Sequence, residues 1–257
     1  MLKVFSRFCK KTNPQKIDEV KPKESTFKTF LWALFFAILI RSLAYEPFHI
    51  PSSSMYPNLL IGDYIFVNKY SYGYSRYSFP FGLKIFEGRI FKSTPKRGEV
   101  VVFRLPSDPS INYVKRLIGL PGDKIQMIDG ILYINGEEVI KKYVGSVIEN
   151  ENGKQVTYQK YLEILPNKKE IITYDREMTP QDNTGIYEVP AGYYFFMGDN
   201  RDDSQDSRFL SFVGFVSEEN LVGKVTNIFF SNPSSIFNII EWFKTIRTER
   251  IGMKINK

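Results

Sequence analysis

Histidine and cysteine are almost absent from this chain of 257 residues, which has only His49 and Cys9. Zinc and iron sites built from these residue types need three or four such ligands, so both kinds of site are excluded. A single cysteine cannot form an intramolecular disulfide, and a Cys–His nucleophile pair would have to join Cys9 to His49 across an apolar segment. A Ser-His-Asp triad survives only with His49 as its base. We therefore expect any general base to be lysine, aspartate or glutamate.

The central part of the chain also lacks an excess of positive charge, although the net charge of the whole chain is +7. Residues 1–45 hold nine Lys/Arg and three Asp/Glu, and residues 241–257 hold five and two. The 195 residues between them hold 21 basic and 23 acidic side chains. Because the basic residues are concentrated at the two ends, the charge does not indicate a nucleic-acid partner.

One membrane-length apolar run extends from Phe27 to Tyr45. Its 19 residues are close to the ~20 that cross a bilayer as a helix. A cleaved signal peptide is the alternative, since Ser42-Leu43-Ala44 has small residues at cleavage spacing. The long basic segment before the run favours an uncleaved anchor. By the positive-inside rule, the N-terminal tail is then cytoplasmic and the rest of the chain lies outside the cytoplasm.

After residue 45 the sequence predicts a mostly β fold. Short runs rich in β-branched and aromatic residues alternate with Asp-Gly and Asn-Gly pairs, which favour tight hairpins. The runs are residues 63–69, 99–105, 124–128 and 131–134, and the pairs include Asp129-Gly130, Asn135-Gly136 and Asn152-Gly153.

Two segments suggest contact either with lipid or with the rest of the protein. Residues 236–250 have apolar side chains at helical spacing with basic residues nearby, which predicts an amphipathic helix. Residues 72–94 interleave aromatic and basic side chains. Each segment could lie in the lipid headgroup zone or pack against the protein, and the sequence leaves both alternatives open.

A serine-rich stretch follows the apolar run directly. Ser52, Ser53 and Ser54 lie between Pro51 and Pro57, two prolines that stiffen the backbone. A stretch of this kind is ordinarily a turn or a helix cap. It becomes a candidate catalytic segment only when it is combined with two later segments of the chain.

The first of these later segments contains Lys115. If residues 112–118 form a strand, Tyr113, Lys115 and Leu117 share one face, which places the lysine among apolar neighbours. Burial lowers the pKa of a lysine because it disfavours the charged form. A neutral lysine can take a proton from a serine hydroxyl, as a hydrolase without a histidine base requires.

The second later segment runs from Met197 to Arg208 and is rich in Asp. The Asp spacing resembles a calcium loop, but no Glu stands at the twelfth position, and Arg201 and Arg208 would oppose a cation. Asp–Arg pairs that fix a loop and present a hydroxyl are the favoured interpretation.

These segments, in this order, resemble bacterial type I signal peptidase, a membrane-bound serine/lysine dyad protease. The resemblance extends from about Phe48 to Phe230. The matching stretches are Pro51-Ser-Ser-Ser-Met-Tyr-Pro, Gly62-Asp63, Lys96-Arg-Gly-Glu-Val-Val-Val-Phe, Tyr113-Val-Lys-Arg-Leu-Ile-Gly-Leu-Pro-Gly-Asp, Gly198-Asp-Asn-Arg-Asp-Asp-Ser-Gln-Asp-Ser-Arg, and Val213-Gly-Phe-Val through Leu221-Val-Gly-Lys.

The resemblance implies a role for each matching residue. Ser54 would be the nucleophile, Lys115 the general base, Ser52 the side-chain donor of the oxyanion hole and Ser204 the residue that orients the lysine. Structural support would come from Arg116, Asp199, Asp206 and Arg208. Two shallow pockets for small substrate side chains would be lined by Phe48, Ile50, Met55, Leu59, Val102, Tyr113 and Val114. Ser53 departs from the family pattern, which has glycine there, and it would be strained if that position requires a positive φ.

The expected protein is therefore a mostly β, membrane-anchored catalytic domain of antiparallel sheets with an inserted β subdomain and one N-terminal transmembrane helix. It would remove signal peptides from exported preproteins at the outer face of the cytoplasmic membrane, without a metal or cofactor, and with preproteins and membrane lipid but no nucleic acid as partners. The alternatives are a Ser/Lys maturation peptidase dedicated to one substrate and a non-catalytic anchored assembly module. The expected division is a tail (1–26), an anchor (27–45), a catalytic core (46–138 and 190–232), an inserted β region (139–189) and an amphipathic basic C-terminal tail (233–257).

Overall fold

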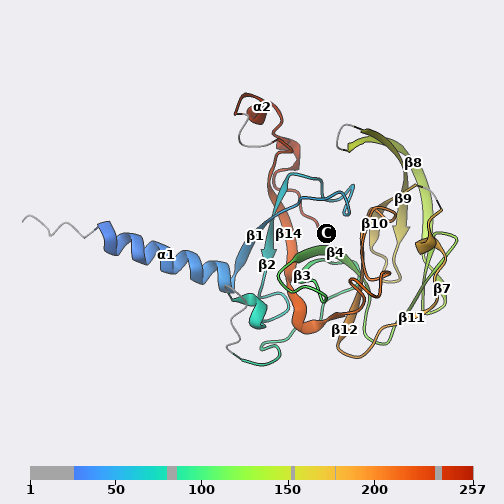
Figure 1. Cartoon of the computed structure of the whole chain (residues 1–257), viewed down its shortest axis with the longest axis horizontal. Coiled ribbons are helices and arrows are strands. Elements are labelled where there is room, and N and C mark those ends of the chain that lie inside the picture. The colour runs from blue at the N-terminus through green and yellow to red at the C-terminus, as the bar shows by residue number, and fades with distance from the viewer. Residues whose placement is uncertain (1–25, 80–85, 152–153, 177, 235–238, 257) are drawn as a thin grey trace, which may run out of the picture. The chain divides into compact units, whose positions relative to one another are not determined.

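A computed structural model describes residues 26–79, 86–151, 154–176, 178–234 and 239–256 (Figure 1). The chain divides into two compact units, residues 1–37 and 38–257. The first described element is helix α1, Thr26–Leu43, whose 18 residues have a mean hydropathy of 1.5. Its large hydrophobic side chains are exposed all round the helix, among them Phe30, Trp32 and Phe36. Such a helix is long enough and apolar enough to cross a bilayer. The helix ends two residues before the predicted limit at Tyr45, which already begins the first strand.

The main sheet has seven strands, and every pair in it is antiparallel. Its order is β1 (Tyr45–His49), β2 (Asp63–Asn68), β14 (Leu221–Ser231), β3 (Val100–Arg104), β4 (Asn112–Gly119), β12 (Tyr193–Met197) and β13 (Val216–Ser217). Strand β14, which comes late in the sequence, therefore lies between the early strands β2 and β3 and pairs with both. The prediction of a mostly β fold built from antiparallel sheets is confirmed.

Both faces of the main sheet are buried, because alternate residues of its strands enter two different hydrophobic clusters. Val100 and Val102 of β3 pack with residues of β2 and β14 on one face. Val101 and Phe103 of β3 pack with Leu117 of β4 and residues of β12 on the other. Since Lys115 is paired with Val101 across β3 and β4, its side chain belongs to a face that is apolar on both sides of it.

Two smaller sheets complete the described part of the chain. One contains β11 (Tyr187–Glu188), β5 (Lys124–Ile128), β6 (Ile131–Ile134) and β7 (Glu137–Glu138). The other, the β8–β10 sheet, contains β10 (Glu170–Asp175), β9 (Lys154–Ile164) and β8 (Ile140–Glu151) (Figure 1). The turns at Asp129-Gly130 and Asn135-Gly136 have positive φ at both residues, as tight hairpins of this type require. Asn152-Gly153 lies outside the described residues.

The strands do not follow the predicted core and insert limits strictly. Strand β11, from the predicted inserted region, pairs with β5 of the predicted core. The β8–β10 sheet itself comes wholly from residues 140–175.

The aromatic-rich segment 72–94 is partly folded into the protein. Tyr72 is buried and donates a hydrogen bond to Glu99, and Tyr77 is also buried. Backbone hydrogen bonds join Tyr74 to Ile90. Phe91 remains largely exposed. Residues 80–85 lie outside the described part. The described aromatic residues near the start of the segment thus favour packing against the protein.

The prediction of one amphipathic helix over 236–250 is wrong. Helix α2 covers only Ile239–Lys244, a 3-10 turn follows at Thr248–Arg250, and Ile236 lies outside the described residues. Arg250 is buried and donates to both carboxylate oxygens of Asp63, at 3.0 and 2.6 Å. Arg247 donates to the Ile61 carbonyl. These two basic side chains therefore bind the Asp63 carboxylate and the Ile61 carbonyl of the protein itself.

Replacing Arg250 with alanine is expected to lower the free energy of unfolding of the full chain by about 3 kcal/mol or more, because it strands the fully buried Asp63 carboxylate without its cation. The matched control is Lys244→Ala on the same segment, where the side chain is exposed and a change within about 0.5 kcal/mol is expected. Denaturant titration in detergent micelles measures both, and equal small effects would contradict the assigned role of the ion pair.

Candidate active site

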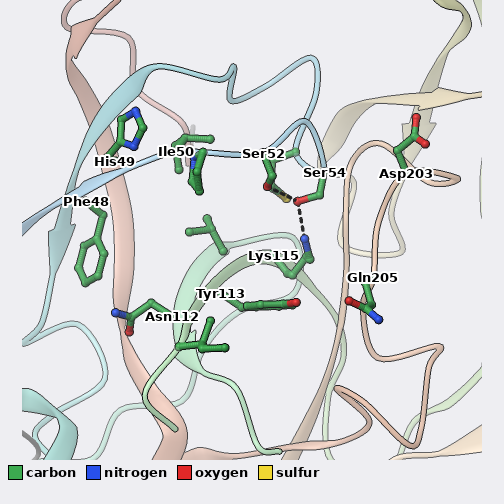
Figure 2. Close-up of a pocket in the computed structure, with 14 residues that line it drawn as sticks. Phe48, His49, Ile50, Ser52, Ser54, Asn112, Tyr113, Lys115, Asp203 and Gln205 are labelled. Atoms are coloured by element: carbon green, nitrogen blue, oxygen red, sulfur yellow. Dashed lines mark hydrogen bonds between the residues drawn. The ribbon is translucent and has the colours of Figure 1, made fainter. Parts of the chain in front are cut away.

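Ser54 and Lys115 meet although 61 residues separate them in the sequence. Lys115 Nζ donates to Ser54 Oγ at 2.5 Å (Figure 2). Ser54 lies in the loop between β1 and β2, whose ends are closed by hydrogen bonds between Ile50 and Asp63 and between Gly62 and Ile50. Lys115 projects from the middle of β4. Both side chains are buried.

The environment of Lys115 lowers its pKa from the usual 10.5 to about 8. Burial is the main cause, since it disfavours the ammonium form. The carboxylates of Asp206 and Asp199 act in the opposite direction, and the Arg208 guanidinium adds to the lowering. At pH 7 about a tenth of this lysine is therefore uncharged and able to accept a proton, far more than for a lysine with the usual pKa.

The two other serines of the stretch are placed differently. Ser52 is exposed, and its Oγ lies 3.4 Å from Ser54 Oγ. Ser53 does not have a positive φ, so the strain considered for a serine at this family glycine position is absent. The Ser53 carbonyl accepts a hydrogen bond from Asn200 Nδ2 at 3.3 Å. Ser53 therefore contributes its backbone to the described contacts.

A glycine and an asparagine of the 197–208 segment hold the serine loop, and sequence reasoning assigned no role to either. The Asn200 backbone N–H donates to the Ser54 carbonyl at 3.1 Å. At Gly198, a Cβ atom would lie 2.5 Å from the Ser54 carbonyl oxygen and 2.2 Å from Ser204 Oγ. Only glycine allows this close approach, because any side chain would push the two segments apart. The sequence signal for both residues was their position in the matching stretch that begins Gly198-Asp-Asn.

Two buried ion pairs support this arrangement. Arg116 donates to both carboxylate oxygens of Asp199, each at 2.6 Å, and also to the Gly98 carbonyl. Arg208 donates to both oxygens of Asp206, each at 2.9 Å, and Asp206 also accepts the Gly198 backbone N–H. The four residues predicted to give structural support thus form two forked pairs, a geometry with strong directional preference.

Ser204 differs from the expectation. Its side chain is buried, but no hydrogen bond joins its Oγ to Lys115 in the described part of the chain; the Ser204 hydroxyl instead bonds to Asp206 and helps to lower the pKa of that carboxyl group. The serine lies beside Gly198 and close to the Ser54 loop, as the contacts at Gly198 indicate.

The β8–β10 sheet buttresses the same segment. Arg201 forms a buried ion pair with Glu163 of β9 at 2.5 Å. Backbone hydrogen bonds join Tyr174 of β10 to Asp199 and to Arg201. Asn58 of the serine loop donates to the Ile172 carbonyl and to Asp199. The inserted region therefore contacts both the serine loop and the 197–208 segment.

A cavity of about 540 Å³ opens over Ser54 and Lys115. Five of the seven predicted pocket residues line it: Phe48, Ile50, Met55, Tyr113 and Val114. Leu59 and Val102 do not, because both are completely buried in the hydrophobic cluster of the main sheet. In Figure 2, Phe48 and Ile50 lie to one side of Ser54, and Asp203 lies to the other. The lining residues that were not predicted are His49, Pro51, Ile111, Asn112, Asp203 and Gln205.

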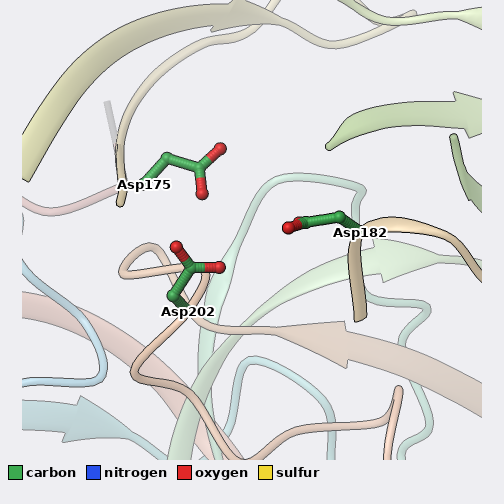
Figure 3. A group of neighbouring side chains, drawn as sticks. All are labelled: Asp175, Asp182 and Asp202. Carbon is green, nitrogen blue, oxygen red and sulfur yellow. The ribbon is translucent and has the colours of Figure 1, made fainter. Parts of the chain in front are cut away.

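Three carboxylates outside the cavity have the spacing of metal ligands, namely Asp175, Asp182 and Asp202 (Figure 3). Each already has a donor, since Lys141 binds Asp175, the Thr179 backbone binds Asp182 and the Arg176 backbone binds Asp202. Burial, followed by the neighbouring Asp175, raises the pKa of Asp202 to about 7.

Comparisons with known proteins give the family of the chain. The family model described as signal peptidase, peptidase S26, matches residues 23–230. Signal peptidase I of Rickettsia typhi is 43% identical over 253 residues, covering 90% of this chain and 93% of its own length. Signal peptidase I of Rickettsia prowazekii is 42% identical over 259 residues, covering 93% and 96%. A crystal structure of a signal peptidase I from Enterococcus faecalis is 30% identical, with a TM-score of 0.32 over 52% of this chain and 98% of that one.

These matches define the class of the protein, which is a peptidase and hence a hydrolase. The chain belongs to the signal peptidase family, peptidase S26. The resemblance drawn from the sequence motifs is confirmed.

Replacing Lys115 with methionine is expected to stabilise the fold at pH 7 by up to about 3 kcal/mol, because the lowered pKa measures the cost of burying the charged amine. In the parent chain this cost is fully present below pH about 8 and disappears as pH rises towards 10.5, where the unfolded lysine also loses its proton. The stability gain of the variant should shrink over the same interval. Denaturant titrations at several pH values measure it, and a gain that is independent of pH would contradict the assigned burial cost.

Proposed function

We propose that the chain is a membrane-anchored serine endopeptidase that removes signal peptides from exported preproteins, with Ser54 as nucleophile and Lys115 as general base. The observation that carries the proposal is the 2.5 Å contact between Ser54 Oγ and the Nζ of a buried lysine. A nucleophile within hydrogen-bond reach of a base with a suitable pKa is the geometry that such catalysis requires.

In the proposed reaction, neutral Lys115 takes the proton of Ser54 while Ser54 Oγ attacks the scissile carbonyl. The Ser54 backbone N–H and Ser52 Oγ donate hydrogen bonds to the developing oxyanion, and a donor of this kind is worth roughly 2.7–4 kcal/mol of barrier. Lys115 then protonates the leaving amine. In the second half, Lys115 takes a proton from a water molecule as that water attacks the acyl carbonyl, and Lys115 then returns the proton to Ser54 Oγ as the ester bond breaks.

Ser204 remains a proposed positioning residue. Its buried hydroxyl donates to Asp206, and the lone pairs of its oxygen remain able to accept an N–H of Lys115 once the amine has become charged. Arg116, Asp199, Asp206 and Arg208 would keep the segment around it in place through their ion pairs.

The apolar part of the cavity is proposed to hold the substrate residues before the cut. Ile50 and Met55 are almost wholly buried beneath it, and Phe48, Tyr113 and Val114 form its more open sides. Ile50 and Met55 would form the apolar floor that receives the small side chains expected for the family.

The proposed membrane topology follows from the basic residues that precede helix α1. Helix α1 would cross the cytoplasmic membrane once, with the basic residues 1–26 in the cytoplasm and residues from 46 onwards on the outer side. The nucleophile would then lie only 11 residues beyond Leu43, the last residue of the helix.

The rival functions differ in substrate range and in chemistry. A maturation peptidase dedicated to one substrate would use the same residues, so a panel of unrelated preproteins separates it from the proposed enzyme. A non-catalytic assembly module would have no use for a lysine buried at a destabilising cost next to a serine. The names of the relatives favour the general enzyme.

Ser54→Ala and Lys115→Ala are each expected to abolish preprotein cleavage by the full chain in detergent micelles, while the circular dichroism spectrum stays unchanged. Ser53→Ala is the matched control, because its side chain makes no described hydrogen bond and activity should be retained. A gel-based assay with purified preprotein provides the measurement. Cleavage retained in either of the first two variants would refute the proposed dyad.

A further inference from the structure

A second cavity lies beside the C-terminal end of α1, and none of the residues that line it also lines the cavity over Ser54. It has a volume of about 430 Å³, and its walls include Arg41, Glu46, Lys69 and Arg104. Three cations and one carboxylate thus face the same space. Ile38 and Phe79 provide apolar surface in the same walls.

Lys69 is the innermost of these cations and is almost completely buried. Its Nζ donates to Glu46 Oε2 at 2.8 Å and to the Ser78 carbonyl at 2.6 Å, which uses two of its three N–H groups. Burial lowers the pKa of Lys69, Glu46 raises it, and Arg41 and Arg104 lower it further. The single carboxylate is therefore insufficient for the positive charge gathered around it.

Glu46 is in addition shared with Arg41. Arg41 donates to Glu46 Oε1 from Nε at 3.1 Å and from Nη2 at 2.9 Å, so the carboxylate serves two cations at once. Buried lysines are rare unless they are paired with a carboxylate. Lys69 has to share the Glu46 carboxylate with Arg41.

Arg104 has an unfilled hydrogen-bonding position. Its Nε is buried and has no hydrogen-bond partner among the described residues. Its Nη1 donates to the Ser110 carbonyl at 3.1 Å. A buried N–H without an acceptor is costly, and an anion held in the cavity would supply one.

We propose that this cavity, defined by Arg41, Lys69 and Arg104, binds a phosphate group, carried either by the headgroup of an anionic phospholipid or by a free phosphate anion. The Nε–H of Arg104, the third N–H of Lys69 and the N–H groups of Arg41 that Glu46 does not use can together donate to the several oxygen atoms of a phosphate. Arg41 stands in the last turn of α1, so the cavity lies where the candidate span ends and lipid headgroups begin. Binding of a lipid headgroup rests on the proposed membrane anchoring. Binding of phosphate from either source is independent of the proposed peptidase chemistry.

Calorimetric titration of the full chain, as its Ser54→Ala form in dodecylmaltoside micelles, tests the proposal. The probes are dihexanoyl phosphatidylglycerol, dihexanoyl phosphatidylcholine and inorganic phosphate. We expect phosphatidylglycerol to bind, and Arg104→Gln to weaken its binding at least about tenfold through loss of charge-assisted hydrogen bonds. Lys142→Gln, which removes an exposed lysine of β8, is the matched control and should leave binding unchanged. Arg41→Gln provides a second test if Arg104→Gln fails to fold.

The outcomes separate the sources. Binding of phosphatidylglycerol without comparable binding of inorganic phosphate supports the lipid, whereas equal binding of inorganic phosphate supports a free anion. Absence of binding by both, binding of phosphatidylcholine as tight as that of phosphatidylglycerol, or identical loss in Arg104→Gln and Lys142→Gln would overturn the proposal. Flotation with neutral phosphatidylcholine vesicles tests the anchoring separately. Since the Ser54→Ala form is used, a failure of the peptidase proposal leaves these results untouched.

Discussion

The contact between Ser54 and Lys115 depends on keeping an amine away from water. Lys115 can act as a base near neutral pH only because its face of the main sheet is apolar on both sides of it and because the serine loop covers it. The two nearby carboxylates oppose the lowering of its pKa, yet each is itself matched by an arginine. Burial therefore remains the dominant influence on the lysine, at a cost in stability that the rest of the fold must offset.

The charged residues around the site hold segments together that are distant in the sequence. Asp199 joins β4 through Arg116 and the serine loop through Asn58. Arg201 extends the connection to Glu163 in the β8–β10 sheet. Removing one member of such a buried pair strands the other, so these residues constrain geometry more strongly than their net contribution to stability suggests. The inserted region thus belongs to the support of the site.

Local patterns in the sequence were sufficient for much of the fold. Alternation along residues 112–118 placed Lys115 inward with Leu117, and the Asp-Gly and Asn-Gly pairs that the structure describes form the expected hairpins. Leu59 and Val102 were wrongly assigned to the substrate pockets, because an apolar residue near a site can equally belong to the hydrophobic core beneath it. The C-terminal helix was overestimated because Asp63, which captures Arg250, lies 187 residues earlier. The supporting role of the β8–β10 sheet arises from tertiary contacts that no local pattern encodes.

The most direct test of the account is the rate at which a serine-directed acylating probe modifies Ser54 as a function of pH. If neutral Lys115 is the base, the rate rises about tenfold per pH unit and reaches a plateau above about 8, where the lysine has lost its proton. The Lys115→Ala form shows no such transition. A transition near 10.5, the value of an ordinary lysine, or the same profile with and without Lys115 would contradict the account.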